Sequence, residues 1–180
     1  MRFGVRSRPG DVVPVDRERI VGERGLYQGS ALTTVDPKGR VAIPANLRST
    51  LERNSNARFV VVTVHPKSPC LVGYDLGWSR ERHRELKDQE KRLLERGEAI
   101  DYNVFRDAYN VAEEVPFDNS GRFLLPGFLR MKGGLKDVAF FQGYGDYFEI
   151  WNPDALLAAP DVSPMAQELV RYLLDQRSGK

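Results

Sequence analysis

The sequence contains one unit twice. Residues 36–48 are DPKGRVAIPANLR, and residues 118–130 are DNSGRFLLPGFLR. The shared pattern is D-x-x-G-R, then apolar residues that end at a proline, then two residues and Leu-Arg. A chain with an internal repeat builds its fold from copies of one supersecondary unit. The repeat therefore constrains the architecture more than composition does.

Each part of the repeated unit predicts a local structure. The carboxylates of Asp36 and Asp118 can accept hydrogen bonds from the backbone that follows them. Gly39 and Gly121 can adopt positive φ, so each D-x-x-G segment is expected to form a turn. Apolar alternation after the turn predicts a strand with one buried face. The proline then ends the strand and suits the first turn of a short helix.

Similar patterns predict the remaining elements. Strands are expected at 27–35, 59–64, 70–74 and 111–117, and a hairpin at 138–142 and 147–151. The short helices 44–52 and 126–132 should bury Leu47 and Leu129 and turn Arg48 and Arg130 outward. Ser79 is a candidate N-cap for a charged helix that ends near Gly97, and a short helix should follow it over 100–108. Asn152 and Ser163 are expected to cap two further helices.

These elements predict five parts of the chain. Residues 1–25 carry six arginines without a clear period and are expected to form a flexible arm. The first repeat should occupy 26–77, a helical linker 78–109, the second repeat 110–154 and a C-terminal helix 155–180. Units this small bury little surface alone, so the repeats should pack on each other, on the linker or on other chains.

Composition excludes several classes of protein. Hydrophobic residues make up 41% and charged residues 29% of the chain, which is typical of a soluble globular protein. No apolar run is long enough for a membrane span, and the single cysteine fits a reducing cytoplasm. The sequence lacks GxxxxGK[ST], GxSxG, HExxH and CxxC. His65 and Cys70 without further ligands do not make a zinc site, and we expect no metal, cofactor or small-molecule substrate.

The distribution of charge favours the first repeat as a surface for a polyanion. Residues 27–78 have a net charge of +3, and residues 109–151 have a net charge of −2. An arginine leaves each turn, Arg40 in the first copy and Arg122 in the second. A guanidinium held at a rigid turn can bind phosphate or the edge of guanine. The alternative is that each arginine only forms an ion pair with the aspartate of its own turn.

With both turns, both Pro-to-Leu-Arg helices and the strand end Glu149-Ile-Trp151, the chain over residues 26–155 resembles the MraZ family of bacterial transcriptional regulators. These proteins have two tandem repeats of the type found in AbrB-like regulators and MazE-like antitoxins. The resemblance implies an α+β, β-rich fold, a double-split (swapped-hairpin) β-barrel formed by both repeats, with connecting and C-terminal helices. It also implies a ring-shaped homo-oligomer in the cytoplasm, associated with the nucleoid.

The function implied by the resemblance is sequence-specific binding of double-stranded DNA at direct repeats upstream of the division and cell-wall gene cluster. The resemblance implies that the turn arginine, here Arg40 and by repetition Arg122, contacts DNA. From the residues themselves we expect Lys38 to neutralise phosphate and Arg48 to support both from its helix. Asp36, Gly39, Asp118 and Gly121 would shape the turns. Two alternatives remain: an oligomeric, antitoxin-like protein-interaction module without a DNA role, and a hydrolase with paired carboxylates, which the lack of a plausible nucleophile disfavours.

Overall fold

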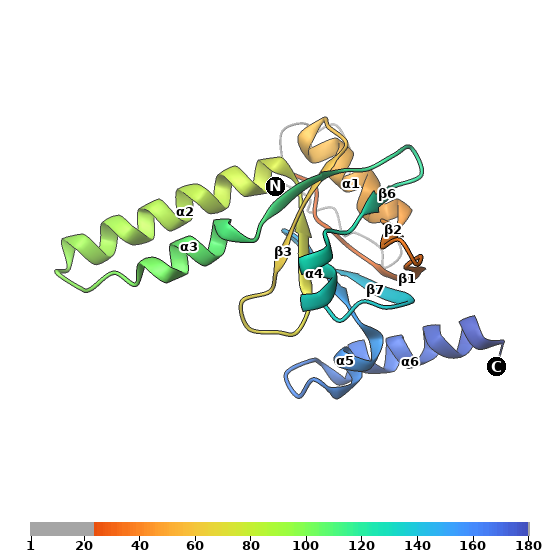
Figure 1. Ribbon diagram of the computed structural model, residues 1–180. Coiled ribbons are helices and arrows are strands. Elements are labelled where there is room, and N and C mark those ends of the chain that lie inside the picture. The colour runs from red at the N-terminus through yellow and green to blue at the C-terminus, as the bar shows by residue number, and fades with distance from the viewer. Residues whose placement is uncertain (1–23, 180) are drawn as a thin grey trace, which may run out of the picture.

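The computed structural model describes residues 24–179, so all but the last two residues of the predicted arm at 1–25 lie outside the described residues. The described chain is an α+β structure with two antiparallel sheets, as predicted (Figure 1). Its strands are β1 (Ser30–Thr34), β2 (Arg40–Ala42), β3 (Phe59–Val64), β4 (Leu71–Tyr74), β5 (Glu113–Pro116), β6 (Arg122–Leu124), β7 (Val138–Gly143) and β8 (Phe148–Trp151). Its helices are α1 (Ala45–Ser55), α2 (Leu76–Glu95), α3 (Tyr102–Asn110), α4 (Gly127–Lys132), α5 (Pro153–Ala158) and α6 (Pro164–Ser178).

The two repeats exchange strands. The larger sheet has the order β1-β7-β8-β4-β3-β5, so the first strand of each repeat pairs with the hairpin of the other repeat. Strands β4 and β8, which occupy equivalent places in the two repeats, pair at the centre. The smaller sheet is a two-stranded ribbon of β2 and β6, one strand from each repeat. Neither repeat therefore completes its own sheet.

The main core lies between this ribbon and one face of the six-stranded sheet. Because side chains alternate along a strand, Val60 and Val62 of β3 face this core together with Phe141 and Ile150. The predicted core residues Leu47 and Leu129 are fully buried here. Helices α5 and α6 pack on the other face of the sheet around a second cluster. Its members are Cys70, Phe140, Trp151, Leu156, Ala159 and Val170.

Helices α2 and α3 form an arm that extends away from the sheets (Figure 1). Neither helix has a fully buried residue. The prediction that Ser79 caps the first of them is wrong: α2 begins at Leu76, and Asp75 is the cap. Aspartate is as good a cap as serine, and the earlier start lets Leu76 and Trp78 pack on the sheet. No helix within 24–179 is long and apolar enough to cross a membrane.

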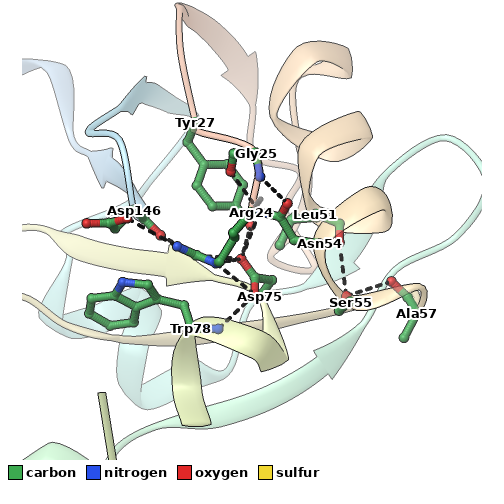
Figure 2. A network of polar contacts seen from close by, with 10 residues as sticks. All are labelled: Arg24, Gly25, Tyr27, Leu51, Asn54, Ser55, Ala57, Asp75, Trp78 and Asp146. Atoms are coloured by element: carbon green, nitrogen blue, oxygen red, sulfur yellow. Dashed lines mark hydrogen bonds and ion pairs between the residues drawn. The ribbon is translucent and has the colours of Figure 1, made fainter. Parts of the chain in front are cut away.

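Asp75 also accepts hydrogen bonds from four residues and so joins three segments of the chain, residues 24–27, α1 and the start of α2, as Figure 2 shows. Its carboxylate, which has no solvent exposure, accepts hydrogen bonds from the Arg24 guanidinium at 2.6 Å and from Tyr27 Oη at 2.8 Å. Asn54 Nδ2 at 3.2 Å and the backbone N–H of Trp78 at 2.8 Å complete the set. Burial alone would raise the pKa of Asp75, but these donors outweigh it and lower the pKa below its usual value.

The N-caps of the last two helices agree with the prediction. Asn152 Oδ1 accepts from the backbone N–H of Asp154 at 2.9 Å and begins α5. Ser163 Oγ accepts from the N–H of Ala166 at 3.2 Å and begins α6. The division of the chain into five parts stays a prediction.

Candidate nucleic-acid interface

The two D-x-x-G-R segments form matching turns. In the first, Asp36 Oδ1 accepts from the backbone N–H of Arg40 at 2.8 Å, and Gly39 has φ +84°. In the second, Asp118 Oδ1 accepts from the N–H of Arg122 at 2.9 Å, and Gly121 has φ +78°. These N–H groups are the largest cause that lowers the pKa of each aspartate below its usual value. The ionised carboxylates therefore hold their turns through these hydrogen bonds.

The ribbon that leaves these turns presents both arginines on one surface. Arg40 pairs with Leu124, and Ala42 pairs with Arg122. The residues between them in β2 and β6 are buried in the core. Since side chains alternate, the four paired residues share the outer face, with Arg40 and Arg122 on one diagonal. Diagonal neighbours in an antiparallel pair are about 7–8 Å apart at the backbone. Two guanidiniums, one from each repeat, thus share one small surface.

Arg40 also forms an ion pair with Asp36 of its own turn. The distance between Arg40 Nε and Asp36 Oδ2 is 2.6 Å, and 57% of the Arg40 side chain remains exposed. An exposed pair between residues four apart contributes only about 0.2–1 kcal/mol. The pair orients the guanidinium along the turn. The free energy lost on breaking it is small enough for a phosphate or a base to replace the carboxylate as the partner of Arg40.

Each turn is supported by the opposite repeat. Arg130 of α4 lies against the first turn and donates to the carbonyl of Pro37 at 3.4 Å. Arg48 of α1 lies over the second turn, where a β-carbon on Gly121 would be 3.0 Å from Arg48 Cδ. The sequence predicted that both arginines turn outward into solvent. In the structure both are half-buried instead. They cross to the other turn because the ribbon places it beside their helix.

Backbone hydrogen bonds repeat this exchange. The N–H of Leu125 donates to the carbonyl of Gly39 at 3.0 Å. The N–H of Ile43 donates to the carbonyl of Gly121 at 2.9 Å. Neither turn can therefore move without disturbing the strand that leaves the other.

Comparison with known proteins agrees with this arrangement. No protein-family model matches the sequence. The transcriptional regulator MraZ of Rhodospirillum rubrum is 33% identical over 143 residues, which cover 78% of this chain and 88% of the relative. MraZ of Gluconobacter oxydans is 32% identical over 132 residues, covering 72% and 77%. MraZ of Shewanella oneidensis is 31% identical over 147 residues, covering 81% and 90%.

The chain belongs to the MraZ family. This is a family of transcriptional regulators and not of enzymes. Membership implies tandem AbrB-like domains, in agreement with the repeat.

In this MraZ-family chain, cationic side chains of the first repeat also lie at the second turn, which the net charges of the two repeats did not predict. Arg58, which follows α1, donates to the side chain of Asn119 in the second turn. Together with Arg48, it brings two cations of the first repeat to the acidic second repeat. Lys38 is exposed on the first turn, where the second turn has Ser120. The contrast of +3 against −2 therefore does not map onto two separate surfaces. The sequence did not indicate Arg58 as a residue of the second turn, because no local pattern relates it to Asn119, 61 positions away.

The other polar candidates in this MraZ-family chain have structural surroundings. His65 Nδ1 accepts from the backbone N–H groups of Lys67 at 3.1 Å and Ser68 at 2.8 Å, which holds a tight loop. Cys70 is buried, and burial raises the pKa of its thiol. Among residues 24–179, no group of three or more His, Cys, Asp or Glu side chains could hold a metal ion.

Proposed function

We propose that this chain binds double-stranded DNA sequence-specifically and represses transcription at direct repeats upstream of the division and cell-wall gene cluster. We further propose that the exchanged strands form the double-split, swapped-hairpin barrel, and that the protein acts in the cytoplasm on the nucleoid. The observation that supports DNA binding is the common outer face of Arg40 and Arg122 on one ribbon. A two-stranded ribbon fits the major groove of B-DNA.

Each residue of the proposed interface has a separate role. Arg40 binds a guanine edge or clamps phosphate, because a guanidinium is a planar, forked donor. Lys38 neutralises phosphate beside it. Arg122 makes the weaker second contact, since its turn lacks a counterpart of Lys38. Arg48 supports the interface from α1 by bracing the turn that carries Arg122.

We also propose that the protein assembles into a ring. The extension formed by α2 and α3 exposes apolar side chains, among them Leu94 on α2 and Val104 on α3. Helix α6 exposes Met165, Leu169 and Tyr172, which lie on one side of the helix because they are four and three residues apart. Surfaces of this kind favour contacts between subunits. A ring presents several equivalent ribbons, and binding of the first raises the effective concentration of the next at neighbouring sites.

The same apolar surfaces support the second candidate, an oligomeric, antitoxin-like module that binds protein without DNA. The two candidates differ in what the ribbon must do. A protein-interaction module does not need Arg40, whereas the DNA-binding reading depends on it.

The test is a mobility-shift titration with duplex DNA from upstream of the chain's own gene. The wild-type protein should bind it in preference to a shuffled duplex, and Arg40→Ala should abolish that preference. Arg122→Ala should weaken binding less. Arg84→Ala removes the same charge from an exposed position on α2 and serves as the control. In Lys38→Ala, the slope of log affinity against log salt should fall by about one phosphate contact. Equal affinity of Arg40→Ala and wild type for the promoter would reject the proposal.

Light scattering tests the assembly separately. The chain should elute well above its mass of 20.4 kDa without DNA, and moderate salt should not dissociate it, since apolar contacts are not screened. A monodisperse monomer at micromolar concentration would reject the ring and the multivalent explanation of affinity.

A further inference from the structure

Leu124 is an apolar side chain on the otherwise arginine-bearing face of the ribbon. It lies directly across from Arg40 in the register of β2 and β6. Its exposed fraction is 57%. Its counterpart in the first repeat is Ala42, which is only partly exposed and lies across from Arg122. One diagonal of the ribbon thus joins two arginines at equivalent positions of the repeats, whereas the other joins an alanine to a leucine.

A large exposed leucine between two guanidiniums does not suit the core of a protein interface. Such cores are depleted of charged residues. Arg40 is the cross-strand neighbour of Leu124, and Arg122 lies two residues before it on the same strand, so a protein covering Leu124 would also bury both charges. DNA offers both kinds of partner together, because its major groove presents guanine acceptors and the C5-methyl group of thymine on adjacent base pairs.

The dimensions of the ribbon agree with this partner. Directly opposed side chains in an antiparallel pair have β-carbons about 4.5–5.5 Å apart. Successive base pairs are about 3.4 Å apart along the helix axis. A leucine opposed to an arginine that binds guanine therefore reaches the base pair one or two steps away.

We propose that Leu124 is a specificity-determining residue that recognises a thymine methyl group beside the base pair bound by Arg40. The inference rests on the proposed DNA-binding function. The shorter Ala42 makes the corresponding contact weaker at the Arg122 end, so the two ends of the ribbon prefer different base pairs.

Deoxyuridine tests the contact, because it lacks only the methyl group of thymidine. A short duplex is first selected from a random pool by the wild-type protein. Each thymine is then replaced in turn by uracil, and affinity is measured for wild type, Leu124→Ala and Leu124→Ile. In wild type, one replacement near the guanine that depends on Arg40 should weaken binding about fourfold, as expected for one methyl group removed from an apolar contact.

In Leu124→Ala the same replacement should have no effect, and in Leu124→Ile the sensitivity should return. Phe128→Ala, which removes an exposed apolar side chain from α4 and not from the ribbon, should keep the wild-type pattern. Loss of the uracil effect in both Leu124→Ala and Phe128→Ala would overturn the assignment. So would a Leu124→Ala protein of smaller assembly size by light scattering, because Leu124 would then belong to a protein interface.

Failure of this inference differs from failure of the proposed function. If selection enriches a sequence and Arg40→Ala loses it, but every uracil replacement acts equally on wild type and Leu124→Ala, only the leucine assignment is wrong. If selection enriches no sequence, the DNA-binding function itself is wrong, and the leucine assignment falls with it.

Discussion

Replacement of Asp75 by alanine should destabilise the protein more than loss of any other helix cap. The change removes the acceptor for Arg24, Tyr27, Asn54 and the N–H of Trp78 at once. Because the carboxylate has no solvent exposure, water cannot readily replace it as the partner of these donors. The Arg24 side chain, 15% exposed, would keep its charge beside Asp146 alone.

The expected magnitude comes from the removal of one partner of a buried ion pair, which costs about 3–5 kcal/mol. The conservative Asp75→Asn keeps an oxygen for the Trp78 cap and loses the charge, so it should cost about 1.5–3 kcal/mol, as for hydrogen bonds to charged groups. Ser163→Ala is the control, because it removes only the cap of α6 and should cost about 1 kcal/mol.

The assay is equilibrium unfolding in urea at one protein concentration, since assembly makes apparent stability depend on concentration. The order of loss in free energy of unfolding should be Asp75→Ala, then Asp75→Asn, then Ser163→Ala. A loss in Asp75→Ala no greater than that in Ser163→Ala would refute the argument that the buried carboxylate holds the three segments together.

Three further predictions concern single groups. Burial lowers the pKa of His65 below its ordinary value of about 6.5; the nearby Glu149 opposes this effect, and Arg82 and Lys67 add to it. On acidification the unfolded chain therefore takes up the proton before the folded protein does. The free energy of unfolding should fall as the pH drops below about 6.5 toward the folded-state pKa. His65→Gln should flatten this slope, and an unchanged slope would show that other groups cause it. Gly39→Ala should cost about 1–2 kcal/mol because φ is +84°, whereas Gly127→Ala, whose β-carbon meets nothing within 4 Å, should not destabilise; equal thermal shifts would contradict this. Cys70 should resist iodoacetamide in the native protein and react in concentrated urea, because burial raises the pKa of its thiol; rapid native labelling, followed by mass spectrometry, would disagree.

Local features of the sequence were sufficient where neighbouring residues decide the structure. The turn at Asp36, the hairpin of β7 and β8, and the caps at Asn152 and Ser163 follow from patterns a few residues long, and the elements lie within a few residues of the expected ranges. Aspartate and serine are equally good caps, so residue type could not decide between Asp75 and Ser79. The earlier start depends on the packing of Leu76 and Trp78 against strands distant in the sequence. Periodicity of one chain does not reveal such contacts.

The candidate site shows the same division. Repetition alone identified Arg40 and Arg122 as equivalent residues, yet it could not reveal that Arg48 and Arg130 cross to the opposite turns. The exchange of strands followed only from the family resemblance, because each repeat has the pattern of a complete unit. Which strands pair is decided by packing between segments far apart in the chain.

The exchange of strands between the repeats has a consequence for how such a chain can evolve. If the two halves were separate identical molecules, every substitution would appear on both sides of the ribbon at once. Carried in one chain, the halves still complete each other but mutate independently, so the equivalent positions of the two repeats can differ, as Lys38 differs from Ser120 and Ala42 from Leu124. Gene duplication can in this way give a symmetric scaffold two chemically different ends. A ribbon with different ends can bind an asymmetric ligand in one fixed orientation.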